Sequence, residues 1–160
     1  MKSQPEYFMT EALKEAKKGC NNNEVPVGAV IVKNNKIIAR AYSKVNILKD
    51  PTAHAEMRAI QKAAKKLKNE RLKDCSIYVT IEPCAMCAGA LVLSRVDKLI
   101  YGALEPKTGA VKSVFKIASG KKLNHRIKIT GGILQEECAY IMRKFFKERR
   151  EKHLRLTNGN

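Results

Sequence analysis

The sequence lacks any apolar segment long enough to cross a membrane, and it shows no secretory segment ahead of its cysteines. It also has no internal repeat, low-complexity tract or linker. The five cysteines are an odd number, which argues against a disulfide framework. We therefore expect one compact domain over residues 1–160, in a protein of the reducing cytoplasm that has no membrane partner.

Acidic residues are scarce. The chain has 15 Asp and Glu against 32 Lys and Arg, which gives a formal net charge of +17 and a pI near 9.8. This excess indicates a polyanionic partner, with nucleic acid as the leading candidate. Residues 57–73 carry seven basic residues against one acid, and residues 112–155 carry thirteen against four. For the first segment, a solvated helix face is an equally good interpretation. In the second, Phe145 and Phe146 interrupt the basic run and either stack on a base or anchor the helix to the core.

Hydrophobic periodicity predicts a chain that alternates between helices and strands. The pattern favours helices over residues 7–18 and from about 134 to 156, a hairpin of strands 27–32 and 36–42, and strands over 76–81, 98–101 and 127–129. Two more helices are expected around the segments AHAEMRAIQKAAKKL, with Thr52 as N-cap, and AMCAGALVLSR. Successive strand–helix units predict parallel pairing in a sheet covered on both faces, which is an α/β fold.

Two short segments carry the residues of a hydrolytic metal site. His54 and Glu56 stand in THAE, and Cys84 and Cys87 stand in EPCAMC. One imidazole and two thiolates supply three ligands and leave the fourth position of a tetrahedral zinc to water, as in catalytic sites. Zinc lowers the pKa of such a water to roughly 7, and Glu56 is placed to handle the protons. The pattern HxE followed by PCxxC is the signature of zinc-dependent nucleobase deaminases.

Simpler interpretations exist for each part of this pattern. A CxxC pair alone is also typical of a redox site, although that leaves the His-Ala-Glu segment unexplained. A purely structural zinc would require a fourth ligand, which Cys75 or a distant histidine, His125 or His153, could supply on folding. Cys20, Cys75 and Cys138 are most simply buried apolar side chains.

Nearly the whole chain resembles the bacterial-type tRNA-specific adenosine deaminases. The resemblance rests on EVPVGAV at residues 24–30, DPTAHAE at 50–56, YVTIEPCAMCAGALVLSR at 78–95, KTGA at 107–110, LNHR at 123–126 and the basic tail with its two phenylalanines. It implies a cytidine deaminase-like three-layer α/β/α fold, with a mixed five-stranded sheet between helices, and a homodimer. The implied activity is hydrolytic deamination of the wobble adenosine in a tRNA anticodon stem-loop to inosine.

By the same resemblance, His54, Cys84 and Cys87 hold one Zn²⁺ per subunit, and Glu56 is the catalytic proton shuttle. The backbone N–H of Ala55 is expected to bond the flipped base, and Val27 to form an apolar wall. The expected RNA contacts are Lys107, Thr108, Ser113, Asn124, His125, Arg126, Phe145, Phe146, Arg149 and Arg150.

The chain departs from this family at three positions near the expected substrate. Ser43 stands where the family usually has an Asn that bonds the base, a role that Asn46 could take over. Glu105 replaces a common Asp, and Lys116 replaces a small polar or acidic residue. These changes leave the chemistry intact and concern the choice of substrate. Two alternatives stay open: an adenine deaminase on other single-stranded RNA or DNA, because a flipped base in a basic groove does not itself require a ribose, and a non-catalytic zinc-containing RNA-binding module. A deaminase of free cytidine or guanine is disfavoured, because such substrates do not require a charge of +17.

Overall fold

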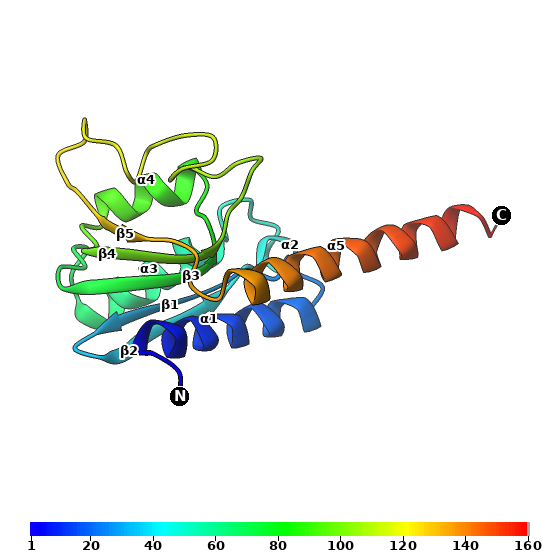
Figure 1. Ribbon diagram of the computed structural model, residues 1–160, viewed down its shortest axis with the longest axis horizontal. Helices are drawn as coiled ribbons and strands as arrows, with labels where there is room; N and C mark the ends of the chain where they lie inside the picture. Colours follow the sequence, from blue (N-terminus) through cyan, green and yellow to red (C-terminus); the bar gives the residue numbers. More distant parts are fainter. Residues whose placement is uncertain (160) are drawn as a thin grey trace.

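The computed structural model of the protein describes residues 1–159 and shows one five-stranded sheet with helices on both faces (Figure 1). The strands are β1 (Gly28–Lys33), β2 (Lys36–Tyr42), β3 (Cys75–Ile81), β4 (Lys98–Ala103) and β5 (Lys128–Thr130). The helices are α1 (Gln4–Asn21), α2 (Val45–Leu48), α3 (Ala55–Leu67), α4 (Ala85–Leu93) and α5 (Gln135–Thr157). Each element expected from the sequence is present, α2 is additional, and residue 160 lies outside the described residues.

The sheet is mixed, with the strand order β2-β1-β3-β4-β5. β1 pairs antiparallel with β2 and β3, whereas β3 with β4 and β4 with β5 are parallel, which confirms the predicted pairing. The β1–β2 hairpin turns at Asn34 and Asn35, whose φ angles of 50° and 58° suit a type I′ turn. The carboxyl ends of the parallel strands β3 and β4 meet at the same end of the sheet, where binding sites of α/β proteins usually form.

Alternate residues of the central strands belong to two different cores. In β1, Ala29 and Ile31 pack in the core that contains residues of α3 and α4, whereas Val30 and Val32 pack in the core that contains residues of α1 and α5. This alternation follows from the two-residue repeat of a strand. Both faces of the sheet are therefore covered, and the expected three-layer α/β/α arrangement is confirmed (Figure 1).

Helix α1 begins three residues earlier than its apolar periodicity predicts. Ser3 is the N-cap: its side chain accepts a hydrogen bond from the Glu6 backbone, and the Glu6 side chain accepts one from the Ser3 backbone. Pro5 stands in the first turn, where its missing N–H has no cost. This capping box fixes the start of the helix.

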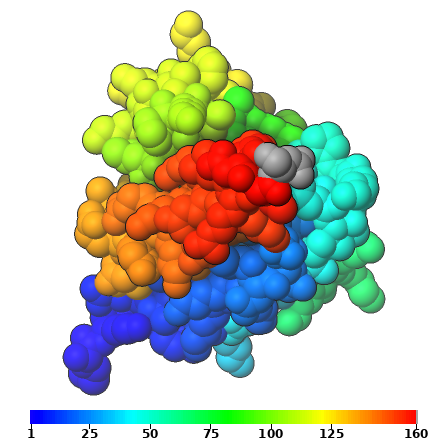
Figure 2. Space-filling model, turned by 90° about the vertical axis from the view of Figure 1, so that its right-hand side faces the viewer, coloured from blue at the N-terminus to red at the C-terminus, as the bar shows by residue number. Residues whose placement is uncertain are grey.

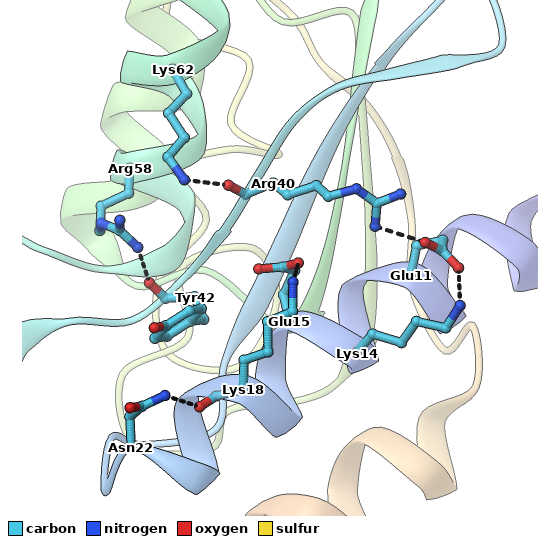
Figure 3. Close-up of polar contacts among 9 residues, drawn as sticks. All are labelled: Glu11, Lys14, Glu15, Lys18, Asn22, Arg40, Tyr42, Arg58 and Lys62. Atoms are coloured by element: carbon cyan, nitrogen blue, oxygen red, sulfur yellow. Dashed lines mark hydrogen bonds and ion pairs between the residues drawn. The ribbon is translucent and has the colours of Figure 1, made fainter.

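Strand β2 lies at an edge of the sheet, and α3 protects that edge (Figure 3). Arg58 donates to the Tyr42 carbonyl at 2.6 Å, and Lys62 donates to the Arg40 carbonyl at 2.7 Å. The Arg40 side chain in turn donates to Glu11 of α1. These bonds occupy backbone acceptors that a second chain could otherwise pair with. Two of the basic residues of segment 57–73, Arg58 and Lys62, thus stabilise the fold by binding β2.

Helix α5 packs on the sheet only with its first part, and the remainder projects beyond the domain (Figure 1). Figure 2 looks onto its free end, with the segment that follows β4 above it and the α2 region beside it. Among residues 1–159, no helix combines the length and apolar character needed to cross a membrane.

Candidate active site

Three side chains converge at the carboxyl end of β3 and the starts of α3 and α4. His54 is the N-cap of α3 and Cys84 the N-cap of α4, while Cys87 lies in the first turn of α4. Both cysteine sulfurs lie 3.6 Å from Nδ1 of His54. The expected N-cap role of Thr52 is wrong: α3 starts at Ala55, and the Thr52 hydroxyl donates to Asp50. The chain therefore presents His54 from the cap position and not from within the first turn.

The spacing of these three ligand atoms fits a tetrahedral zinc ion. Bonds of about 2.3 Å to sulfur and about 2.0 Å to nitrogen, at the tetrahedral angle, place sulfur and nitrogen about 3.5 Å apart. All three ligand atoms lie within 4.8 Å of one another, and no fourth His, Cys, Asp or Glu of residues 1–159 belongs to the group. Three protein ligands with an open position are the donor set of a catalytic zinc site.

The other cysteines lie elsewhere. Cys75 and Cys138 are buried, as expected, but the same expectation is wrong for Cys20, which is partly exposed. Neither Cys75 nor His125 belongs to the group of three. The structural-zinc interpretation therefore has no closing ligand among the described residues.

The two ligand thiols differ in their ease of ionisation. A hydrogen bond with Cys87 and a second with His54 lower the pKa of Cys84 to about 4. The same bond to Cys84, together with burial, raises the pKa of Cys87 above its usual range. The hydrogen bond with Cys84 also raises the pKa of His54. Cys84 is thus held as a thiolate at neutral pH, the form that binds metals.

Glu56 lies beside the three ligands at the start of α3. The residue is only 3% exposed, and this burial raises the pKa of its carboxyl group above the usual range. Glu56 also lines the cavity that contains His54 and Cys84. A buried carboxyl group with a raised pKa is suited to accept and return a proton near neutral pH.

The site opens into a cavity of about 1530 Å³ between α5, the α2 region and the segment after β4. It brings together most residues expected around the substrate. Those that line it are Val27, Ser43, Asn46, Ala55, Glu105, Lys107, Thr108, Phe146, Arg149 and Arg150. Ser113, Lys116, Asn124, His125, Arg126 and Phe145 do not line it. His125 is hydrogen-bonded to the Val96 carbonyl, and Asn124 accepts a bond from Arg95, so this loop lies by the end of α4.

The two phenylalanines of α5 have different surroundings. Phe145 is 6% exposed and packs inward, with the Arg149 guanidinium 4.8 Å from its ring centroid. Phe146 is 39% exposed and lines the cavity. Its ring meets the Phe145 ring edge-on, with the two ring centroids 5.4 Å apart. Of the two roles that the sequence left open, anchoring fits Phe145 and stacking on a base fits Phe146.

Two buried carboxylates that line the cavity, Glu24 and Glu82, have roles that the sequence does not predict. Glu24, in EVPVGAV, accepts hydrogen bonds from the backbone N–H groups of Asn46 and Ile47 and so fixes α2. Glu82, in EPCAMC, accepts bonds from the segment after β4. Both residues stand inside segments that carry the family resemblance, but their partners lie more than twenty positions away. Nothing in the local sequence indicates these contacts.

Three comparisons with known proteins agree with this geometry. Residues 3–150 match the family model of MafB19-like deaminases. The tRNA-specific adenosine deaminase of Aquifex aeolicus is 51% identical over 145 residues, which is 91% of this chain and 95% of that protein. The tRNA-specific adenosine deaminase of Bacillus subtilis is 45% identical over 150 residues, covering 94% and 93% of the two chains.

A solved structure from a study of A-to-I editing by tRNA:A34 deaminases at the wobble position superposes with a TM-score of 0.82. It is 41% identical, and the match covers 84% of this chain and 98% of the other. The expected cytidine deaminase-like fold is confirmed by this likeness.

Proposed function

Because this chain belongs to the tRNA-specific adenosine deaminases, we propose that it converts the wobble adenosine of a tRNA anticodon loop to inosine, with zinc held by His54, Cys84 and Cys87. The chain is an enzyme of adenosine deamination on tRNA. One observation carries the finer proposal. The three ligand atoms lie together at zinc spacing, and two of the ligands, His54 and Cys84, line one cavity with the buried Glu56 and with basic and aromatic side chains.

The proposed reaction is hydrolysis at ring carbon six of adenine. When bound, zinc supplies a coordinated water of lowered pKa. Glu56 accepts one proton from the attacking water and delivers it to the adjacent ring nitrogen. It then accepts the second proton, from the hydroxyl group now on carbon six, and delivers it to the amino group. The carbon–nitrogen bond to the amino group breaks, ammonia leaves, and the base becomes hypoxanthine. A raised pKa lets the Glu56 carboxyl group carry the proton between these steps.

Recognition of the flipped base is proposed for residues at the cavity floor. As the first residue of α3, Ala55 has a backbone N–H without an intrahelical partner, which supports a hydrogen bond to the base. Val27 supplies an apolar wall. Ser43 is only 5% exposed and offers one hydroxyl, whereas the Asn46 amide already donates to the Asn23 carbonyl. Ser43 is therefore the better placed of the two to meet the base.

Two groups of residues are proposed to contact the RNA, one inside the cavity and one outside it. Lys107, Thr108, Arg149 and Arg150 line the cavity and would meet nucleotides next to the flipped base, with Phe146 stacking on one of them. Ser113, Lys116, Asn124, His125 and Arg126 lie outside this cavity, and we propose that they contact the RNA farther from the reacting base.

We further propose that the protein works as a cytoplasmic homodimer of single-domain subunits. Leu93 of α4 is 80% exposed, and Val114 and Phe115 of the segment after β4 are also exposed, which supports an interface on this side of the molecule. Analytical ultracentrifugation of wild type and Leu93→Glu tests the proposal. A dimer that dissociates in the variant supports it, and a monomeric wild type contradicts it.

The test of function is a mass-spectrometric assay of inosine in RNA hairpins. One hairpin carries adenosine at the wobble position of an anticodon loop, a second carries it at the neighbouring position, and a third is the matched DNA. Conversion of the wobble adenosine in RNA alone supports the proposal. Equal conversion of DNA would favour a deaminase of relaxed substrate choice, and binding without conversion would favour an RNA-binding module.

A further inference from the structure

The segment of residues 105–113 has no helix or extended strand to hold it, and its first four residues, 105–108, line the cavity. It begins after β4 and presents Lys107 and Thr108 to the cavity. A loop with basic residues that must meet RNA in one arrangement needs an internal support, because an unsupported loop loses conformational entropy on binding.

Glu82 supplies that support from the end of β3. The residue is 1% exposed, and no Lys, Arg or His among residues 1–159 forms an ion pair with it. Its Oε2 accepts hydrogen bonds from the backbone N–H groups of Val111 (3.1 Å), Lys112 (2.8 Å) and Ser113 (3.0 Å). Its Oε1 accepts from the Glu105 N–H at 3.1 Å and from the Ser113 hydroxyl.

The carboxylate thus bonds both ends of the segment. A buried charge without a cation must be stabilised by such N–H dipoles, so the loop and the carboxylate depend on one another. The chain of bonds continues toward the RNA side: the Glu105 carboxylate accepts a hydrogen bond from the backbone N–H of Lys107 at 3.0 Å.

The middle of the segment is tied to the metal ligand itself. The Ala110 N–H donates to the Pro83 carbonyl at 2.7 Å, and Gly109 forms a β-bridge with Cys84. Gly109 has no room for a side chain, since a Cβ there would lie 2.4 Å from the Glu82 carboxyl carbon. Residues 82–84 therefore hold the loop on one side and a candidate zinc ligand on the other.

We infer that Glu82 is a positioning residue that fixes residues 105–113 so that Lys107 and Thr108 meet the RNA in register with the zinc site. It acts through the loop and donates nothing to the substrate. The inference rests on the proposed function for the identity of the substrate. It also explains why a glutamate is needed: both oxygens must accept, and a glutamine would turn one NH₂ group toward a backbone N–H.

The test compares Glu82→Gln with Glu11→Gln, a matched change of a buried glutamate on the α1 side of the sheet (Figure 3). Glu11 pairs with Lys14 and Arg40 and touches no residue of the loop. For Glu82→Gln we expect KM for the RNA hairpin to rise about tenfold, with kcat changed less than about threefold and zinc content retained. Hydrogen exchange of the Val111, Lys112 and Ser113 amides should accelerate. Glu11→Gln should alter neither KM nor exchange in residues 105–113.

A second variant keeps the inference testable if Glu82→Gln does not fold. Gly109→Ala should displace the same loop and raise KM in the same way. Where Glu82→Gln folds, combining the two changes should not multiply their effects. Unchanged KM and loop exchange in Glu82→Gln would overturn the inference. So would a loss of kcat and zinc at unchanged KM, because Glu82 would then support the metal site.

Failure of the proposed function can be distinguished from failure of this inference by the activity of the wild type. A wild type that does not deaminate RNA would refute that function. The exchange experiment would still show whether Glu82 holds the loop.

Discussion

Phe145 and Phe146 are neighbours of identical chemistry, and the structure predicts opposite consequences for their replacement by alanine. Phe145 is 6% exposed, so Phe145→Ala removes buried apolar surface and should lower the free energy of unfolding by about 3 kcal/mol. For a chain of this length, that corresponds to a decrease in Tm of roughly 10 °C. RNA affinity of the folded variant at low temperature should change little, because the ring does not line the cavity.

Phe146→Ala should do the reverse. The residue is 39% exposed, so its loss removes less buried surface than the loss of Phe145, together with an edge contact worth about 1 kcal/mol, and Tm should fall by about 4 °C. If the ring stacks on a base, its removal should cost about 1 to 3 kcal/mol of binding, which is about a fivefold to 150-fold rise in Kd.

Both effects are measured in the Glu56→Ala background, so that RNA is bound but not turned over. Thermal unfolding followed by circular dichroism gives Tm, and fluorescence anisotropy of a labelled RNA hairpin gives Kd. Phe146→Ala with unchanged Kd would refute the stacking role. Equal losses of Tm in the two variants would refute the division between an anchoring ring and a cavity ring.

Three further predictions concern charge and the tail. The logarithm of the RNA association constant should fall with the logarithm of salt concentration with a slope of about −3, if four phosphates are neutralised; a flat plot between low and moderate salt would contradict an electrostatic footprint. Removing residues after Lys144 should weaken RNA binding at least about tenfold while zinc content by atomic absorption stays constant; unchanged affinity would assign the tail a structural role only. The Glu82 pKa of about 2 lies below its ordinary 4.5, so its stabilisation of about 3 kcal/mol is present above pH 4.5 and lost as the pH falls toward 2. In urea unfolding, the stability difference between wild type and Glu82→Gln should therefore shrink by about 2 kcal/mol from about pH 6 to about pH 3, and a constant difference would contradict this.

Sequence patterns predicted the layers of the fold because its elements have clear periodicity. β2 was predicted with the bounds that it has, and β1 and β3 within one residue, because strand residues alternate between two buried faces and turn residues delimit them. Helix ends were less predictable. The start of α3 depends on the path of residues 50–54, where Asp50 accepts hydrogen bonds from Thr52 and leaves His54 as the cap.

The ligand trio could be predicted because its spacing is fixed by local helix starts, and the motif contains all three residues. The walls of the cavity could not. Glu82 meets residues 105–113 only through the parallel pairing of β3 with β4, and Phe146 lines the cavity only because α5 crosses it. Such contacts depend on the tertiary arrangement, so they cannot be predicted from the hydrophobic periodicity of the sequence or from the spacing of its motifs.

The proposed reaction depends on proton transfer by Glu56 at a zinc site formed by His54, Cys84 and Cys87. It is tested most directly by following inosine formation in an RNA hairpin by mass spectrometry with wild type and Glu56→Ala, while zinc content and RNA affinity are measured on the same preparations. We expect conversion by wild type, and for Glu56→Ala no detectable conversion with unchanged zinc content and Kd. Conversion by Glu56→Ala at a rate close to wild type would contradict it.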